Sequence, residues 1–149
     1  MLGWVNRRLY AGKDTRSLPG GQQTRGQDAE ASVGRIRKVL VVDDEADVAD
    51  LAEMLLSAHG LDAVVAYSGA AALEMLASHP DIDAVVSDVM MPGMNGLELA
   101  AQIAERYPKI KIILASGYMA PSMFQQQPLT QLFIAKPYKV EQLIKLLHT

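Results

Sequence analysis

The chain has 149 residues, 50% of them hydrophobic and 21% charged, with a net charge of −3. These values are typical of a globular protein with one domain and a short appendage. Disulfides and thiolate metal sites are excluded because the chain has no cysteine, and its three histidines lack the spacing of metal ligands. It has neither a bilayer-length apolar run nor a signal-peptide pattern, so we expect a cytoplasmic protein with no membrane partner.

The charge is divided unevenly along the chain. Residues 1–36 contain six Lys or Arg and three Asp or Glu, whereas the remainder contains eight and fourteen, so the net charges are +3 and −6. An acidic domain of this kind is not expected to bind nucleic acid, because phosphate contacts require clustered basic residues. Residues 1–36 have no sustained hydrophobic period and include the turn-rich run 18–26. We predict a flexible basic extension or linker over 1–36 and a folded domain over 37–149.

In the predicted domain, short apolar runs alternate with segments whose apolar residues recur at helical spacing. Strands are predicted at 38–42, 63–67, 84–87, 109–115 and 132–135, and helices at 45–59, 69–78 with Ser68 as its N-cap, 96–107 and 140–148. In the first helix we expect Val48, Leu51, Ala52 and Leu55 to form the buried stripe. Between the last two strands only about two turns of helix are expected, a shortened fourth helix, because Pro128 interrupts it.

This alternation predicts an α/β fold, a doubly wound parallel sheet with helices on both faces. Polar residues stand where strands end: Asp43 and Asp44, Asp88, Ser116 and Lys136. Taken singly, each is more simply explained as a helix cap, a turn residue, a loop start or a solvated charge. If the strand order is 2-1-3-4-5, however, the three carboxylates converge at the switch point and need a cation between them. Mg²⁺ suits such a site better than Ca²⁺, because few protein ligands are supplied.

Four segments together resemble the receiver domains of two-component signalling, and the resemblance covers residues 37–149. They are Val39–Glu45, Ser87–Gly96, Leu114–Gly117 and Phe133–Pro137. The resemblance implies a five-stranded, flavodoxin-like sheet of order 2-1-3-4-5, as in the chemotaxis receiver that is a standard example of that order. It also implies a response regulator domain that takes part in a phosphorelay.

The resemblance assigns roles to the residues at the strand ends. Asp88 would be the phosphoacceptor, the site of phosphorylation. The metal site for Mg²⁺ would consist of Asp44 and Asp88 as direct ligands, Asp43 through metal-bound water, and the carbonyl of Met90. Lys136 would bind the phosphoryl oxygens, and its bond to the following proline would be cis.

The resemblance further implies a switch. The hydroxyl of Ser116 would move toward the phosphoryl group, Gly117 would leave room beside it, and Phe133 would be the switch aromatic residue. Residues 117–131 are predicted to be the most mobile part of the domain and to become ordered on phosphorylation. The expected partners are a histidine kinase or histidine phosphotransfer protein, and a downstream protein or second copy on the fourth-helix, fifth-strand and fifth-helix face.

The expected activity is self-catalysed phosphorylation and slow dephosphorylation rather than turnover of a separate substrate. Slow dephosphorylation is expected because Met90 and Tyr118, two residues beyond Asp88 and Ser116, are large and not acidic. A phosphatase-like hydrolase with an aspartate nucleophile is the alternative, but it would need a second acid where Met90 stands. The pair Asp81 and Asp83 precedes a strand and is interpreted as a solvated loop. The chain could be a stand-alone regulator or the receiver fragment of a hybrid histidine kinase.

Overall fold

A computed structural model describes residues 35–117 and 132–149. The chain divides into two units, Met1–Arg35 and Ile36–Thr149, and only the second is described below. The predictions for the basic extension, the shortened fourth helix, Tyr118 and the mobile segment fall wholly or almost wholly outside the described residues. None of the helices in those two ranges is both long and apolar enough to cross a membrane.

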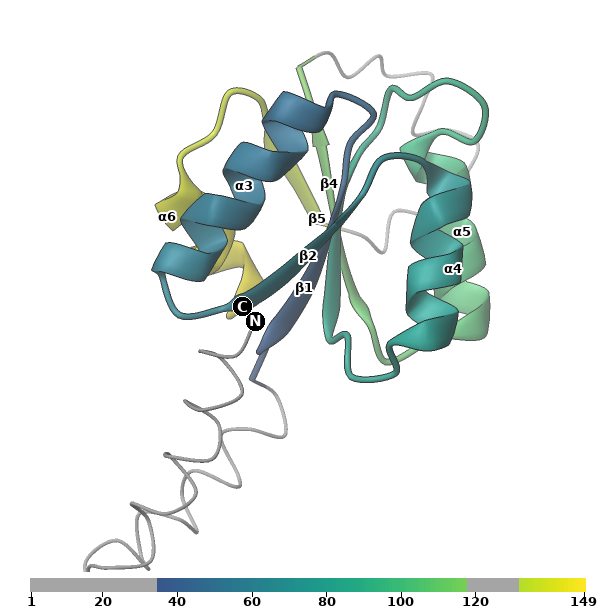
Figure 1. Ribbon diagram of the computed structural model, residues 1–149, viewed down its shortest axis with the longest axis horizontal. Helices are drawn as coiled ribbons and strands as arrows, with labels where there is room; N and C mark the ends of the chain where they lie inside the picture. The colour runs from purple at the N-terminus through teal and green to yellow at the C-terminus, as the bar shows by residue number, and fades with distance from the viewer. Residues whose placement is uncertain (1–34, 118–131) are drawn as a thin grey trace, which may run out of the picture. The chain divides into compact units, whose positions relative to one another are not determined.

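The described residues form five strands and four helices. In chain order they are β1 (Lys38–Val42), α3 (Ala46–Ala58), β2 (Asp62–Ala66), α4 (Gly69–Ser78), β3 (Ala84–Asp88), α5 (Gly96–Arg106), β4 (Lys111–Ser116), β5 (Leu132–Ala135) and α6 (Val140–Leu147). All strand pairs are parallel and the order is β2-β1-β3-β4-β5, which confirms the predicted topology. Helices α3 and α6 cover one face of the sheet, and α4 and α5 cover the other (Figure 1).

The inner strand β1 is buried along its whole length because it lies between two layers of helices. Val39 and Val41 belong to the core beneath α3 and α6, whereas Leu40 and Val42 belong to the core beneath α4 and α5. This alternation follows from the two-residue period of a strand, and a strand buried on both faces reads as a continuous apolar run. Ile36 is also buried in the first of these cores.

The predicted boundaries agree with the structure at half of the element ends and differ by one or two residues at the other half. Strand β4 begins at Lys111 rather than Lys109, because the amide of Ile110 donates to the carbonyl of Tyr107 and closes a turn there. Helix α4 begins as predicted after Ser68, whose hydroxyl accepts a hydrogen bond from the amide of Ala71 at 3.0 Å.

The predicted buried stripe of α3 was wrong at three of its four positions. Ala49, Ala52 and Leu56 face the sheet, while Val48, Leu51 and Leu55 are 38%, 51% and 36% exposed. The buried row and the exposed row have the same i, i+3, i+7 spacing, so periodicity alone cannot choose between them. In the structure the row with two alanines is the one that lies against the sheet.

The interpretation of Asp83 as part of a solvated loop was also wrong. One of its carboxylate oxygens accepts hydrogen bonds from the amides of Arg37 and Lys38 at 2.8 and 2.9 Å. Asp81 remains 55% exposed, but it lies 3.3 Å from the Nζ atom of Lys38. Because β1 and β3 are neighbouring parallel strands, their amino ends meet at one edge of the sheet. There Asp83 binds the backbone at the start of β1, and Asp81 pairs with the side chain of Lys38.

Candidate functional site

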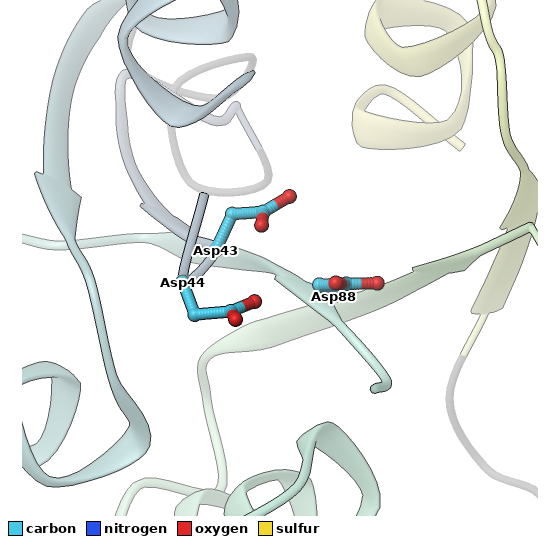
Figure 2. Close-up of side chains that lie close together, drawn as sticks. All are labelled: Asp43, Asp44 and Asp88. Carbon is cyan, nitrogen blue, oxygen red and sulfur yellow. The ribbon is translucent and has the colours of Figure 1, made fainter. Parts of the chain in front are cut away.

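The structure brings the three predicted carboxylates together at the opposite edge of the sheet. Val42 pairs with Ser87 at the end of the β1–β3 ladder, so the next residues, Asp43 and Asp88, are neighbours. Ligand atoms of Asp43, Asp44 and Asp88 all lie within 4.8 Å of one another. Figure 2 shows the carboxylates extending from two neighbouring strand ends into one space. The convergence expected from the strand order is therefore present.

The three carboxylates differ in their surroundings. The Asp43 residue is 3% exposed, and one of its oxygens accepts a hydrogen bond from the amide of Glu45 at 3.0 Å. Asp88 is the last residue of β3, and its side chain is 11% exposed. Asp44 is exposed at the rim. The cluster thus has a buried side and an open side from which a ligand can enter.

Lys136 provides a positive charge at this edge. Its Nζ atom lies 2.8 Å from an oxygen of Asp43 and 3.4 Å from an oxygen of Asp88. The amide of Lys136 donates to the carbonyl of Ser116 at 3.0 Å, which continues the β4–β5 ladder beyond the strand. The bond between Lys136 and Pro137 is cis, as the resemblance implied. A lysine that follows β5 therefore reaches across the end of β4 to acids at the ends of β1 and β3.

The electrostatics of the site are those of a partly buried, crowded acidic cluster. Burial raises the pKa of Asp88 above its ordinary value, and the nearby Asp43 carboxylate acts in the same direction, against the attraction of Lys136. Burial opposes the charged form of Lys136, but the hydrogen bond to Asp43 and the attraction of Asp88 outweigh it, so the pKa of Lys136 is raised. The Lys136 ammonium thus contacts two of the three carboxylates, and three acidic groups accompany one basic group at the site.

These residues fit a hard divalent cation. All the side-chain donors are carboxylate oxygens, which are the ligands that Mg²⁺ prefers, and they are few enough to leave room for water or a phosphate oxygen. The loop after Asp88 is anchored by Val89 and Met91, which are 0% and 8% exposed, while the side chain of Met90 between them is 56% exposed. The role of the Met90 carbonyl as a ligand stays a prediction.

The two predicted switch residues lie on the neighbouring strands. Ser116 ends β4, is 2% exposed, and follows the residue that pairs with Asp88. It also pairs with Ala135, the residue before Lys136. Phe133 lies within β5, pairs with Leu114 and is partly buried against the core under α4 and α5. Ser116 is thus in the sheet position between the acidic cluster and the lysine, and Phe133 is farther from it along β5.

Two residues beside Asp88 were not singled out from the sequence. Ser87 is 1% exposed, and its hydroxyl donates to the carbonyl oxygen of Asp88 at 2.9 Å. Gly96 begins α5 so close to this carbonyl that a Cβ atom there would collide with the oxygen. In the sequence, Ser87 is simply a strand residue and Gly96 a helix start, so no local pattern could have revealed that both meet the same peptide group.

Comparisons with known proteins agree with this geometry. Residues 39–148 match the family model of the response regulator receiver domain. The chain is 34% identical over 113 residues to the DNA-binding transcriptional regulator NtrC of Escherichia coli K12, covering 72% of this chain but only 23% of that protein.

Two solved structures are similar over most of their own length. One is a response regulator receiver protein from Sinorhizobium medicae WSM419, which is 29% identical with a TM-score of 0.66. The similarity covers 76% of this chain and 94% of that one. The other is the chemotaxis protein CheY4 from Vibrio cholerae, which is 28% identical with a TM-score of 0.66. Here 75% of this chain and 96% of the other are covered.

Proposed function

This chain belongs to the response regulator receiver domain family, and from that membership we propose that it accepts a phosphoryl group on the carboxylate of Asp88 in an Mg²⁺-dependent reaction. The observation that carries the proposal is the grouping of Asp43, Asp44 and Asp88 within 4.8 Å, with the ammonium of Lys136 against two of them. Ordinary helix caps and turn residues would not need three carboxylates and a lysine in one partly buried cluster.

The chemistry required of the protein is alignment and charge neutralisation. A carboxylate oxygen of Asp88 would form a bond to phosphorus while the bond from phosphorus to the donor's imidazole nitrogen breaks. The released electron pair stays on that nitrogen, and the donor leaves as a neutral histidine because its other ring nitrogen carries a proton during the transfer. Lys136 would turn from Asp43 and Asp88 toward the incoming group, bind the phosphoryl oxygens and offset their charge.

Asp43, Asp44, Asp88 and the carbonyl of Met90 are the residues that would hold Mg²⁺. When bound, the ion supplies positive charge to the carboxylates and to the phosphoryl oxygens. Asp43 and Asp44 have no role as nucleophiles in this scheme, because they follow β1 and serve the metal. A phosphatase-like reaction is disfavoured, since position 90 has a methionine where that mechanism would need an acid.

We further propose that phosphorylation is read out through Ser116 and Phe133. A phosphoryl group on Asp88 would offer new hydrogen-bond acceptors to the Ser116 hydroxyl on the adjacent strand. A shift of Ser116 would then displace the residues of β4 and β5 that pair with each other beside it. The phosphoryl donor would be a histidine kinase or a histidine phosphotransfer protein. The receiving surface would be the face that includes β5 and α6, for a downstream protein or a second copy of the chain. The same chemistry serves a stand-alone regulator and the receiver of a hybrid kinase.

The test is phosphorylation of the purified chain by a small acyl phosphate, measured by intact mass with and without Mg²⁺. We expect one added phosphoryl group only with Mg²⁺, and none in the Asp88→Asn variant. Asp81→Asn is the matched control, because Asp81 is an exposed aspartate at the opposite edge of the sheet. Undiminished modification of Asp88→Asn, or equal modification without a divalent cation, would contradict the proposal.

A further inference from the structure

Two residues that are separated in sequence meet the peptide group that follows Asp88. The hydroxyl of Ser87 donates to the Asp88 carbonyl oxygen at 2.9 Å. Gly96 also lies close to this group, where any Cβ would collide with that oxygen and crowd the Cα atom of Val89. Ser87 is 1% exposed, so water does not compete for the hydrogen bond.

This peptide group is the junction between the strand that carries Asp88 and the loop that carries Met90. The next residue, Val89, is already paired through both of its backbone groups. Its amide donates to the carbonyl of Ala115 at 3.0 Å, and its carbonyl accepts from the amide of Gly96 at 2.8 Å. Because the Asp88 carbonyl and the Val89 amide belong to one planar peptide group, a tilt of that group would change the backbone angles of both residues, and so the position of the Met90 backbone relative to Asp88.

We propose that Ser87 is a positioning residue for the metal site. Its buried hydroxyl orients the Asp88 peptide group so that the Asp88 carboxylate and the Met90 carbonyl face the same ion. Because Gly96 has no side chain, there is room for the Asp88 carbonyl in this orientation. The hydrogen bond from Ser87 then favours this orientation over others. The inference rests on the proposed function, because it assigns Ser87 a purpose toward the Mg²⁺ that Asp88 and Met90 would bind.

A purely structural role for Ser87 makes a different prediction. A hydroxyl that only satisfied a buried carbonyl would stabilise the fold without changing metal affinity in the folded protein. The variants Ser87→Thr and Ser87→Val separate the two roles. Both add nearly the same volume, but threonine keeps the hydroxyl, whereas valine has a methyl group in its place. Any overpacking of the buried position is common to both variants, so their difference reports the hydrogen bond alone.

The experiment measures Mg²⁺ affinity by calorimetry without any phosphoryl donor, and unfolding by urea in the same buffer. We expect Ser87→Val to bind Mg²⁺ about three- to tenfold more weakly than Ser87→Thr, the range that one lost hydrogen bond supplies. Phosphorylation by an acyl phosphate should slow in the valine variant at low Mg²⁺ and recover in large part at saturating Mg²⁺. That split distinguishes a displaced metal ligand from a general loss of folded protein.

Equal Mg²⁺ affinities for the folded threonine and valine variants would overturn the positioning role. If the valine variant fails to fold, Ser87→Ala against wild type makes the same comparison with the hydroxyl lost and no added volume, and unchanged affinity there has the same meaning. Failure of the wild-type chain to bind Mg²⁺ or to be phosphorylated at Asp88 would count against the proposed function instead. The two failures are thus distinguishable.

Discussion

The Nζ atom of Lys136 lies 2.8 Å from a carboxylate oxygen of Asp43, although 93 residues separate them in the chain. The Lys136 side chain is 21% exposed and that of Asp43 is 5% exposed, so the pair is largely shielded from water. A charge in such a place is stabilised by its partner and costly to leave alone. This pair links the last strand of the sheet to the first, and it occupies carboxylates that the proposed cation would also use.

Replacing Lys136 by alanine should therefore have opposite effects on Mg²⁺ binding and on phosphorylation. The free energy of unfolding without Mg²⁺ should fall by about 2 kcal/mol, because partly buried carboxylates lose a charged hydrogen-bond donor. Mg²⁺ should bind more tightly, since a competing positive charge is gone, while phosphorylation should be slower at saturating Mg²⁺. Calorimetry and intact-mass kinetics check the two effects. Weaker Mg²⁺ binding in the variant would contradict this account.

Because the pKa of Asp88 is raised in the folded protein, we predict that ionising Asp88 lowers the free energy of unfolding as the pH rises. Because its pKa in the folded protein lies above the ordinary value of 3.8, the folded protein holds a proton that the unfolded chain has released between these two values. The contribution of Asp88 to stability thus falls as pH rises through a window that begins near 3.8. Without divalent cations, Asp88→Asn should become progressively more stable than wild type from acid to neutral pH.

Urea unfolding at several pH values, with EDTA and then with Mg²⁺, measures this effect. With Mg²⁺, the advantage of Asp88→Asn should shrink or reverse, because the ion binds the folded wild type preferentially. A variant that is less stable than wild type at neutral pH in EDTA would show that attraction to Lys136 outweighs burial.

A leucine-to-alanine substitution should have different effects on stability in the two apolar rows of α3. Leu56→Ala should lower the free energy of unfolding by about 2–5 kcal/mol, since Leu56 is fully buried and a cavity remains. Leu51→Ala should change it by no more than about 0.5 kcal/mol, because Leu51 is 51% exposed. Chemical denaturation of both variants makes the comparison. Equal losses would mean that the exposed row is covered in solution.

The close approach of Gly96 to Asp88 predicts a large cost for a single methyl group. Gly96→Ala should destabilise the domain even though alanine favours a helix by about 1 kcal/mol over glycine, because the backbone oxygen it meets cannot move aside cheaply. Gly117→Ala is the control, since no atom of the described residues lies within 4 Å of the Cβ it would add. Denaturation midpoints decide the question, and similar midpoints for both variants would remove the steric argument.

The strands, the helices and the strand-end acids could be predicted from the sequence alone because their signals are local. An apolar run such as Val39–Val42 predicts a buried strand, Asp43 and Asp44 come next after it, and Asp88 ends the strand that begins with Ala84. The strand order came from the resemblance, and it then placed the three acids at one edge. Parallel strands that neighbour each other must bring their carboxyl ends together, so this part of the site follows from topology.

Other features depend on distances between residues that are remote in sequence, and only the tertiary structure decided them. Two rows of α3 have the same helical period, and the choice between them was made by the sheet on which the helix packs. Asp83 meets the start of β1 only because β3 lies beside it. Ser87 and Gly96 meet at the Asp88 carbonyl because the chain returns after a loop to begin α5 there. Periodicity records which residues share a face, but a contact across the fold depends on where each element is placed.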